Sequence, residues 1–232
     1  MVKIVFEHQD FIVVDKPVGM PMHDPERGII LNSERATGKE KLHLCHRLDT
    51  GTSGCLILAK NPAAAAEFQQ LFSRRKIEKY YLAITQLKPK KKQGSVVGDM
   101  LNRRRGQHIL VKSRENPAVT QFFSSAIEAG HRGFVVKPLT GKTHQIRVAL
   151  KSLGSPIVGD IFYGGIEADR MYLHAWQLQF TYRDEAIHCV SEPCEGKIFQ
   201  SAAFQNWLAK QASPEGLPWP RFNLPGLNHA DP

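Results

Sequence analysis

Residues 46–54 bring together the side chains of this sequence that are best suited to chemistry, in the order His-Arg-Leu-Asp-Thr-Gly-Thr-Ser-Gly. Asp49 supplies the carboxylate of this segment, hydroxyl side chains follow it, and the glycines permit backbone conformations that other residues avoid. A loop beside a buried strand is where a rigid scaffold can present a single functional carboxylate. Spacing alone favours a simpler structure, a capped turn in which Asp49 accepts hydrogen bonds from nearby backbone amides.

The sequence after this loop predicts the elements that position it. Cys55–Ala59 is a continuous apolar run, which is typical of a buried strand. Asn61 is a good N-cap and Pro62 suits the first helical position. Apolar residues at i, i+3 and i+4 from Phe68 then predict a helix that ends near Lys76.

The rest of the chain contains more predicted strands than helices. Upstream, Lys3–Phe6 and Phe11–Asp15 are expected to be short strands, followed by a loop of about 25 residues marked by prolines and glycines. Downstream we expect a strand over Tyr80–Thr85, an exposed hairpin or loop over 86–108, strands over Ile109–Lys112, Thr120–Ala126 and Gly133–Pro138, a helix over His144–Lys151 and a strand pair over Met171–Phe180. This pattern predicts an α+β fold.

Length and composition fit one globular domain with a tail. The 232 residues are 42% hydrophobic and 23% charged, which excludes wholesale disorder, collagen and a bare coiled coil. Residues 213–232 hold five of the 14 prolines and are expected to contribute little to the core. We therefore predict a domain over residues 1–210 and a proline-rich tail over 211–232.

Positive charge is concentrated in one part of the chain. Lys and Arg number 31 against 22 Asp and Glu, for a net charge of +9. Residues 74–114 hold 13 of these basic residues against only Glu78 and Asp99, so the rest of the chain is close to neutral. A concentrated basic segment is expected to bind a polyanion such as a phosphate backbone, and a solvated surface without a partner is the alternative.

The cysteines and the N-terminus indicate a cytoplasmic protein. Four cysteines without a C-x-x-C pair or zinc-site spacing predict reduced thiols and no metal site. The first 14 residues lack a signal-peptide core, and no apolar run is long enough to span a bilayer. We therefore expect a cytoplasmic protein with no membrane partner.

The 46–54 segment resembles, position for position, the HRLD-x-x-TSG signature of the RluA-type pseudouridine synthases, which isomerise uridine in RNA. Further segments match the family's motifs in the same order, namely DKPVG at 15–19 with His23, KYYLA at 79–83, TGKTHQIRV at 140–148, GSPIVGD at 154–160 and LHA at 173–175. The resemblance covers roughly residues 4–180, and such ordered agreement is far more specific than a single motif.

The resemblance implies catalytic roles for Asp49, Tyr81 and Arg147. Asp49 would be the catalytic aspartate, ionised when it attacks the uridine, either at C6 of the base or at the ribose. Because desolvation favours a neutral carboxyl, Asp49 needs a positive partner, and the resemblance assigns Arg147, whose guanidinium stays charged. Tyr81 would stack on the target base and could help to move its proton, whereas Tyr80 would point to the opposite side of the strand and fill space.

The same resemblance suggests residues that contact RNA. The target uridine must leave its stack, so we expect base flipping, with Arg47 and His46 in the gap or on the RNA backbone. A structural role for His46 is an equal alternative. Lys16 and Lys142 are candidate phosphate or supporting charges, and Lys142 stands where many relatives have Arg. The basic hairpin is the expected RNA-gripping surface, through Lys90, Lys91, Lys92, Arg103, Arg104 and Arg105.

These observations predict an RNA pseudouridine synthase with a single α+β catalytic domain around a mixed, mostly antiparallel sheet flanked by helices and loops. The RNA would be ribosomal or transfer RNA, the protein a monomer, and no cofactor or metal is implied because the reaction is a net isomerisation. His144 and Gln145 are expected to be local scaffold. The alternatives are a non-catalytic RNA-binding protein that retains the fold, and a glycosidase-like hydrolase, which would need a second carboxylate as its acid.

Overall fold

The computed structural model describes residues 2–127 and 130–222. Its strands are β1 (Lys3–Glu7), β2 (Phe11–Lys16), β3 (His43–Leu44), β4 (Ser53–Ala59), β5 (Glu78–Thr85), β6 (Gln93–Asn102), β7 (His108–Val111), β8 (Ala118–Ala126), β9 (Arg132–Pro138), β10 (Leu173–Tyr182) and β11 (Glu185–Val190). Its helices are α1 (Ile29–Thr37), α2 (Pro62–Ser73), α3 (Gln145–Ser152) and α4 (Ala202–Ala209), with short 3-10 turns at Arg104–Gly106, Ile161–Tyr163 and Pro214–Gly216.

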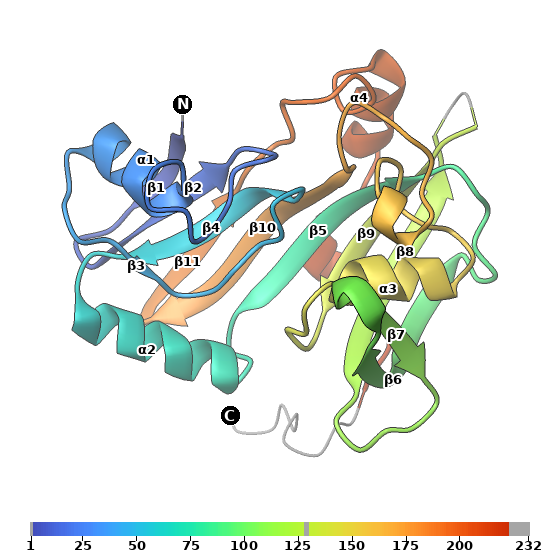
Figure 1. The fold of residues 1–232 in the computed structure, drawn as a ribbon, viewed down its shortest axis with the longest axis horizontal. Helices are drawn as coiled ribbons and strands as arrows, with labels where there is room; N and C mark the ends of the chain where they lie inside the picture. The colour runs from blue at the N-terminus through green and yellow to red at the C-terminus, as the bar shows by residue number, and fades with distance from the viewer. Residues whose placement is uncertain (1, 128–129, 223–232) are drawn as a thin grey trace.

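Across these described ranges the eleven strands form one sheet, in the order β1-β2-β4-β10-β5-β9-β8-β6-β7. β3 pairs with β4, and β11 pairs with β10. The β4–β10 pair is parallel and the other pairs are antiparallel. Figure 1 shows α2 along the half of the sheet that holds β4, and α3 across the half that holds β8 and β9. The predicted α+β fold with a mixed, mostly antiparallel sheet is confirmed.

β4 is buried along its whole length because the sheet is covered on both faces at this point. Leu56 and Leu58 belong to the main core, whereas Cys55 and Ile57 pack with Phe68 of α2 in a second core. A strand buried on both faces has no need of alternating polar residues. The strand predicted over the apolar run is therefore confirmed.

The N-terminus of α2 also forms as predicted. The side-chain oxygen of Asn61 accepts a hydrogen bond from the backbone N–H of Ala64 at 2.8 Å, and Pro62 occupies the first helical position. This capping satisfies one of the amide donors that the first helical turn leaves without partners. The helix fixes the segment that joins β4 to β5, and both of these strands border the loop that carries Asp49.

The prediction of a long loop between β2 and β4 was wrong, because α1 forms within it. Gly28 is its N-cap and provides no side-chain hydrogen bond, so the usual sequence signal for a helix start is missing. Only Ile29 and Ser33 of this short helix are buried, which leaves too few apolar positions for a helical pattern.

Two further predictions are refined by the structure. The basic stretch 86–108 was predicted as an exposed hairpin or loop, and β6 does form a hairpin with β7, but β6 also pairs with β8 and so belongs to the main sheet. The strand pair predicted over Met171–Phe180 is the single strand β10, since no turn residue interrupts it, and its hairpin partner is the later strand β11.

Part of the stretch after α4 packs on the domain, although it was expected to contribute little to the core. Leu217 and Trp219 pack against the main core, and the Trp219 ring lies 4.9 Å from that of Phe123. Phe222 packs against Val119. The composition of this stretch favoured a tail, but large aromatic side chains bury enough apolar surface to hold it on the sheet. Residues 223–232 lie outside the described residues.

The loop that carries Asp49 enters β4 through Gly54. Gly54 has a φ of 109°, in the region that favours glycine, and a Cβ atom there would overlap the backbone carbonyl of Ala175 on β10. Only glycine therefore allows β4 to pair closely with the start of β10. The loop 46–53 consequently lies at the centre of the sheet, where the parallel pair β4–β10 meets β5.

Candidate active site

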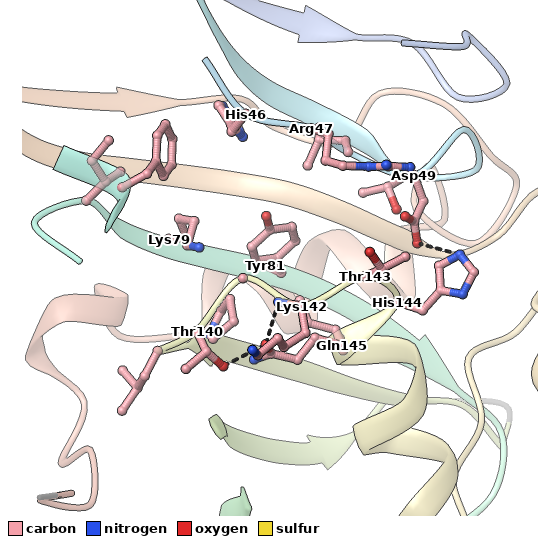
Figure 2. A pocket seen from close by; sticks show the side chains of 18 of the residues that line it. His46, Arg47, Asp49, Lys79, Tyr81, Thr140, Lys142, Thr143, His144 and Gln145 are labelled. Carbon is pink, nitrogen blue, oxygen red and sulfur yellow. Dashed lines mark hydrogen bonds and ion pairs between the residues drawn. The ribbon is translucent and has the colours of Figure 1, made fainter. Parts of the chain in front are cut away.

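A cavity of about 540 Å³ lies between the 46–49 segment, β5 and the residues that lead from β9 into α3. Asp49, Tyr81 and Arg147 all line it, although Asp49 and Arg147 are 98 positions apart in the chain. In the view of Figure 2, Tyr81 lies between Lys79 and Asp49. The three residues that the sequence resemblance assigns to catalysis therefore share one cavity.

Asp49 is held by Arg147, and Arg147 is held in turn by Asp160. Nη1 of Arg147 donates a hydrogen bond to Oδ2 of Asp49 at 3.0 Å, while its Nε and Nη2 donate to the two carboxylate oxygens of Asp160 at 2.8 Å each. Asp160 and Arg147 are both buried. This two-point contact fixes the plane of the guanidinium. Within the described residues, Oδ1 of Asp49 accepts no hydrogen bond, so this oxygen is available to a substrate.

His144 lies on the other side of Asp49. Its φ of 57° is unusual for a residue other than glycine, and its Nδ1 lies 2.9 Å from the hydroxyl of Tyr163. That hydroxyl accepts the backbone N–H of His108 at 3.0 Å, so its own proton can be donated to Nδ1. Nε2 of His144 then carries a proton and faces Oδ2 of Asp49 at 3.9 Å. Burial lowers the pKa of His144, so a neutral imidazole lies beside the carboxylate, where only local scaffold was expected.

Tyr81 and its neighbour Tyr80 occupy opposite faces of β5, as strand alternation requires. Tyr81 lines the cavity, whereas Tyr80 donates its hydroxyl proton to Glu78 and lies near the Trp219 ring. Burial raises the pKa of the Tyr81 hydroxyl, and the nearby Asp49 charge raises it further. Tyr81 therefore presents a neutral aromatic side chain to the cavity at neutral pH.

His46 and Arg47 line the cavity in different ways. Nε2 of His46 accepts the backbone N–H of Ile57 at 3.0 Å, and burial lowers the pKa of the ring to about 3. His46 is therefore a neutral side chain that ties the loop to β4, which agrees with the structural alternative. Arg47 is exposed and also borders a second cavity, formed with residues 21–26. Its position at the mouth suits contact with a bound nucleic acid.

Lys142 and Gln145 shape the segment that leads into α3. Nζ of Lys142 donates a hydrogen bond to the side chain of Asn116 at 2.8 Å. The buried Gln145 accepts from the Thr140 hydroxyl at 2.7 Å and donates to the carbonyl of Val119 at 3.0 Å. Gln145 is thus local scaffold, as expected, while Lys142 lines the cavity.

Lys16 lies beneath the cavity and not on its surface, which favours the supporting role over the phosphate contact that was its alternative. The residue has no exposed surface, and its Nζ donates hydrogen bonds to the carbonyls of Met20 at 2.9 Å, Pro17 at 3.0 Å and Thr50 at 3.3 Å. Burial lowers its pKa to about 8. Lys16 therefore joins the end of β2 to the residue that follows Asp49, beneath the site.

The basic hairpin does not form a single surface at the cavity. Lys90, Lys91 and Lys92 precede β6, and Arg103, Arg104 and Arg105 follow it, so a strand of ten residues separates the two groups. Neither group lines the cavity. The arginine turn, Arg103–Arg105, is nevertheless connected to the site through the two residues that follow Gly106. The side-chain amide of Gln107 donates to the carbonyl of Phe162 at 2.6 Å, and the backbone N–H of His108 donates to the hydroxyl of Tyr163.

Three residues of this site went unassigned in the sequence: Asp160, Tyr163 and Lys79. Asp160 and Lys79 stand inside segments that match the family's motifs, so their positions could have signalled a role. Tyr163 carries no comparable signal. The buried ion pair that makes Asp160 important depends on the turn that follows α3, which the sequence pattern did not predict.

Within residues 2–127 and 130–222, no group of three or more His, Cys, Asp or Glu side chains is arranged to hold a metal ion. In the same described ranges, no helix combines the length and apolar character needed to cross a membrane. The four cysteines are free thiols, and Cys45 alone among them borders the cavity.

Comparison with known proteins gives consistent results. Residues 10–152 match the family model of RNA pseudouridylate synthase. A Haemophilus influenzae protein described as an uncharacterized RNA pseudouridine synthase is 46% identical over 202 residues, which cover 85% of this chain and 90% of the relative. The Pasteurella multocida dual-specificity RNA pseudouridine synthase RluA is 33% identical over 194 residues, which cover 77% of this chain and 86% of that protein.

A solved structure extends the likeness to the fold. Human RNA pseudouridylate synthase domain containing 1 matches with a TM-score of 0.75 at 25% identity, covering 95% of this chain and 97% of the human chain. The family model covers more than half of the chain, and it includes the loop of Asp49, the Tyr81 strand and Arg147. The chain therefore belongs to the RluA-type family of RNA pseudouridine synthases, and it is an isomerase.

Proposed function

We propose that this enzyme converts specific uridines of structured RNA, ribosomal or transfer, to pseudouridine with Asp49 as its nucleophile. The observation that carries the proposal is the pairing of Asp49 with Arg147 at the cavity, with Oδ1 of the carboxylate unpaired within the described residues. A buried guanidinium favours the ionised carboxylate, which desolvation by a bound nucleotide would otherwise disfavour. Asp49 would thus remain a nucleophile in the complex with RNA.

The target uridine would be flipped out of its stack to reach Asp49. Its base would stack on Tyr81, a sequence-tolerant contact that suits an extruded nucleotide. Arg47 at the mouth would contact the RNA backbone or fill the gap that the base leaves, and Lys142 at the rim would contact a phosphate. His46 would keep the Asp49 loop on β4 and touch the nucleotide only through its ring edge.

The reaction breaks the bond between uracil N1 and the ribose, turns the base within the cavity and rejoins it through C5. Asp49 would attack either C6 of the base or the ribose, and either route returns the carboxylate unchanged. The C5 proton leaves and N1 gains a proton, so the reaction balances as an isomerisation with no added cofactor. The high pKa of the Tyr81 hydroxyl makes that group a poor base at neutral pH.

The substrate class is supported by the relatives and by charge. The similar proteins include a dual-specificity RNA pseudouridine synthase RluA and, from Nitrosomonas europaea, a ribosomal large subunit pseudouridine synthase D. We propose that the arginine turn, Arg103–Arg105, grips the RNA beside the target, with the lysine run, Lys90–Lys92, as a more distant contact. We further propose that a monomer acts in the cytoplasm, with residues 1–210 as its catalytic domain.

A non-catalytic RNA-binding protein is the alternative, and one experiment separates the two. Pseudouridines of total RNA are mapped by a chemical adduct that stops reverse transcription, in cells with and without the gene. We expect one or a few sites to be lost on deletion and restored by the wild-type gene but not by Asp49→Asn. If no site changes, the RNA-binding alternative replaces the proposal, and the RNA that co-purifies with the protein becomes the object to identify.

A further inference from the structure

Lys79 is a cation that faces the cavity without an anion beside it. Its ammonium group makes no hydrogen bond or ion pair within the described residues. The ring of Phe72 lies 5.9 Å away, and Nζ is 3.8 Å from the position that a Cβ atom of Gly141 would take. Figure 2 shows the side chain directed into the same space as the Tyr81 ring. The amine thus lies at the cavity wall near the Phe72 ring, with no hydrogen-bonding or anionic partner within the described residues.

Of the other cations that line the cavity, Arg147, Lys137 and Lys142 have partners, whereas the side chains of Arg47 and Arg75 have none within the described residues. Arg147 pairs with two carboxylates, those of Asp49 and Asp160. Nζ of Lys137 lies 2.7 Å from Oε1 of Glu78, and Lys142 donates to Asn116. Lys79 therefore differs from Arg147, Lys137 and Lys142 in being unpaired, and unlike Arg47 and Arg75 it lies on β5 beside Tyr81.

The groups around Lys79 do not neutralise its charge. Nε2 of His46 accepts the backbone N–H of Ile57, so the ring proton lies on Nδ1 and no lone pair remains for Lys79. Burial lowers the pKa of Lys79 to about 8, and no neighbouring carboxylate opposes that shift. Most Lys79 side chains are still protonated at pH 7. A partly buried charge without an anionic partner destabilises the folded protein. Ionisable groups in such positions are typical of functional sites.

The proposed reaction creates a negative charge on the base that the ammonium group of Lys79 could stabilise. If Asp49 attacks C6, electrons move through the ring to O4. If Asp49 attacks the ribose, the electron pair of the N1–C1′ bond stays on the uracil and is shared among N1, O2 and O4. Both routes therefore place negative charge on the oxygens of the base, and the charge disappears when C5 bonds to the ribose.

Strand geometry brings Lys79 to the edge of that base. Lys79 and Tyr81 are two residues apart on β5, so their side chains share a face and their backbones lie roughly 7 Å apart. A base that stacks on Tyr81 would extend its edge over the neighbouring position, which a lysine side chain can reach.

Resting on the proposed function, we propose that Lys79 is a catalytic residue whose ammonium group stabilises the negative charge on the uracil oxygens while the base is detached from its sugar. A cation that is in place before the reaction, in a site with little water, stabilises developing charge without reorganisation. Lys79 is neither consumed nor covalently changed. The alternative is that Lys79 binds a phosphate of the RNA backbone, and the test must distinguish the two roles.

The test compares the wild type with Lys79→Met, which keeps the length of the side chain and removes its charge. The substrate is a transcript of the RNA segment that the pseudouridine map identifies, made with either uridine or 5-fluorouridine. We expect the single-turnover rate on saturating uridine RNA to fall on the order of 10²-fold, with RNA affinity changed less than about threefold. Fluorine withdraws electrons from the ring and so stabilises its negative charge without Lys79. The rate at which the variant consumes the nucleoside, relative to the wild type, should therefore fall much less on 5-fluorouridine RNA than on uridine RNA.

The control is Lys210→Met, which removes an exposed charge at the end of α4, and it should behave as the wild type. Weaker RNA binding with a normal rate on bound RNA would show a phosphate contact and overturn the assignment. Equal defects on both RNAs, or no defect, would also overturn it. A circular dichroism melt shows whether Lys79→Met is folded, and a misfolded variant is replaced by Lys79→Gln. A wild type that converts neither RNA contradicts the proposed function itself, which separates the two failures.

Discussion

Asp160 does not border the cavity, yet it decides where Arg147 points. Its carboxylate binds Arg147 at two points, while Asp49 receives a single hydrogen bond from the same guanidinium. A buried arginine that lost one of its two carboxylates would turn toward the other. Asp49 would then be held more tightly and in a different orientation, which makes it a poorer nucleophile.

We therefore predict that Asp160→Asn lowers the rate of pseudouridine formation on saturating RNA on the order of 10²-fold, as a small misplacement of a reacting group does. RNA affinity should be nearly unchanged, because Asp160 is buried. The matched control is Asp169→Asn, since the Asp169 carboxylate accepts from Tyr172 and Lys197 and does not border the cavity. A variant with a normal rate would show that Arg147 needs no second carboxylate.

At the scale of elements, the turn between β6 and β7 links the basic segment to the site. Gln107 and His108 fasten this turn to Phe162 and Tyr163, and Tyr163 contacts His144 beside Asp49. The lysine run at the other end of β6 has its backbone bound to the carbonyl of Leu153 instead, beyond the C-terminus of α3. The three lysines before β6 and the three arginines after it carry the same charge, but we therefore expect them to contribute unequally to RNA binding.

Replacing Arg103, Arg104 and Arg105 with Gln should weaken RNA binding more than replacing Lys90, Lys91 and Lys92 with Gln, although each change removes three charges. The dependence of log affinity on log salt should flatten by roughly 1 to 3 for the arginine variant and by less for the lysine variant. Filter binding at several salt concentrations measures both. Equal effects would mean that RNA contacts the whole length of β6.

The sequence predicted the elements whose signals are local. β4 is an uninterrupted apolar run, and Asn61 with Pro62 marks the start of α2, so both formed where expected. α1 was missed because its N-cap is glycine and only two of its residues are buried. The sequence left 86–108 as a hairpin or loop and did not predict that β6 joins the main sheet, because pairing with β8 outweighs the low strand propensity of a glycine-containing segment.

The residues of the candidate site also fall into two groups, those that the sequence motifs identified and those whose roles only the folded structure shows. Motif positions identified Asp49, Tyr81 and Arg147, which do meet in one cavity. The resemblance left Lys16 as either a phosphate contact or a supporting charge, because the sequence cannot show that its amine is surrounded by three backbone carbonyls. The role of Asp160 depends on its contact with Arg147, and that of Lys79 on the lack of an anionic partner. Both facts appear only in the folded structure.

At the scale of the whole molecule, two neutral histidines hold the loop that carries Asp49 on the sheet. His46 accepts a hydrogen bond from β4. His174 of β10 donates from Nε2 to the carbonyl of Ser191 and accepts from the Ser53 hydroxyl, which itself accepts from Arg170. Burial lowers the pKa of His46 to about 3 and that of His174 to about 4, from an ordinary value of 6.5.

These pKa values predict a loss of stability in acid. Between pH 6.5 and about 4, the unfolded chain binds protons at both histidines while the folded chain does not, so the free energy of unfolding must fall as the pH is lowered. Urea unfolding at pH 7, 6 and 5 measures the slope. His174→Gln should flatten it, whereas replacing the exposed His23 with Gln should leave it unchanged. An unchanged slope in His174→Gln would mean that His174 is not held neutral.

The central claim is that Asp49, held by Arg147, attacks the target uridine. The most direct measurement is single-turnover pseudouridine formation by purified wild type and Asp49→Asn on the mapped RNA, with affinity measured in parallel. We predict equal affinity within a few fold and a rate that falls by roughly 10⁴-fold or more, the scale seen when an enzyme loses its nucleophile. An Asp49→Asn variant that forms pseudouridine at a rate near that of the wild type would contradict this claim.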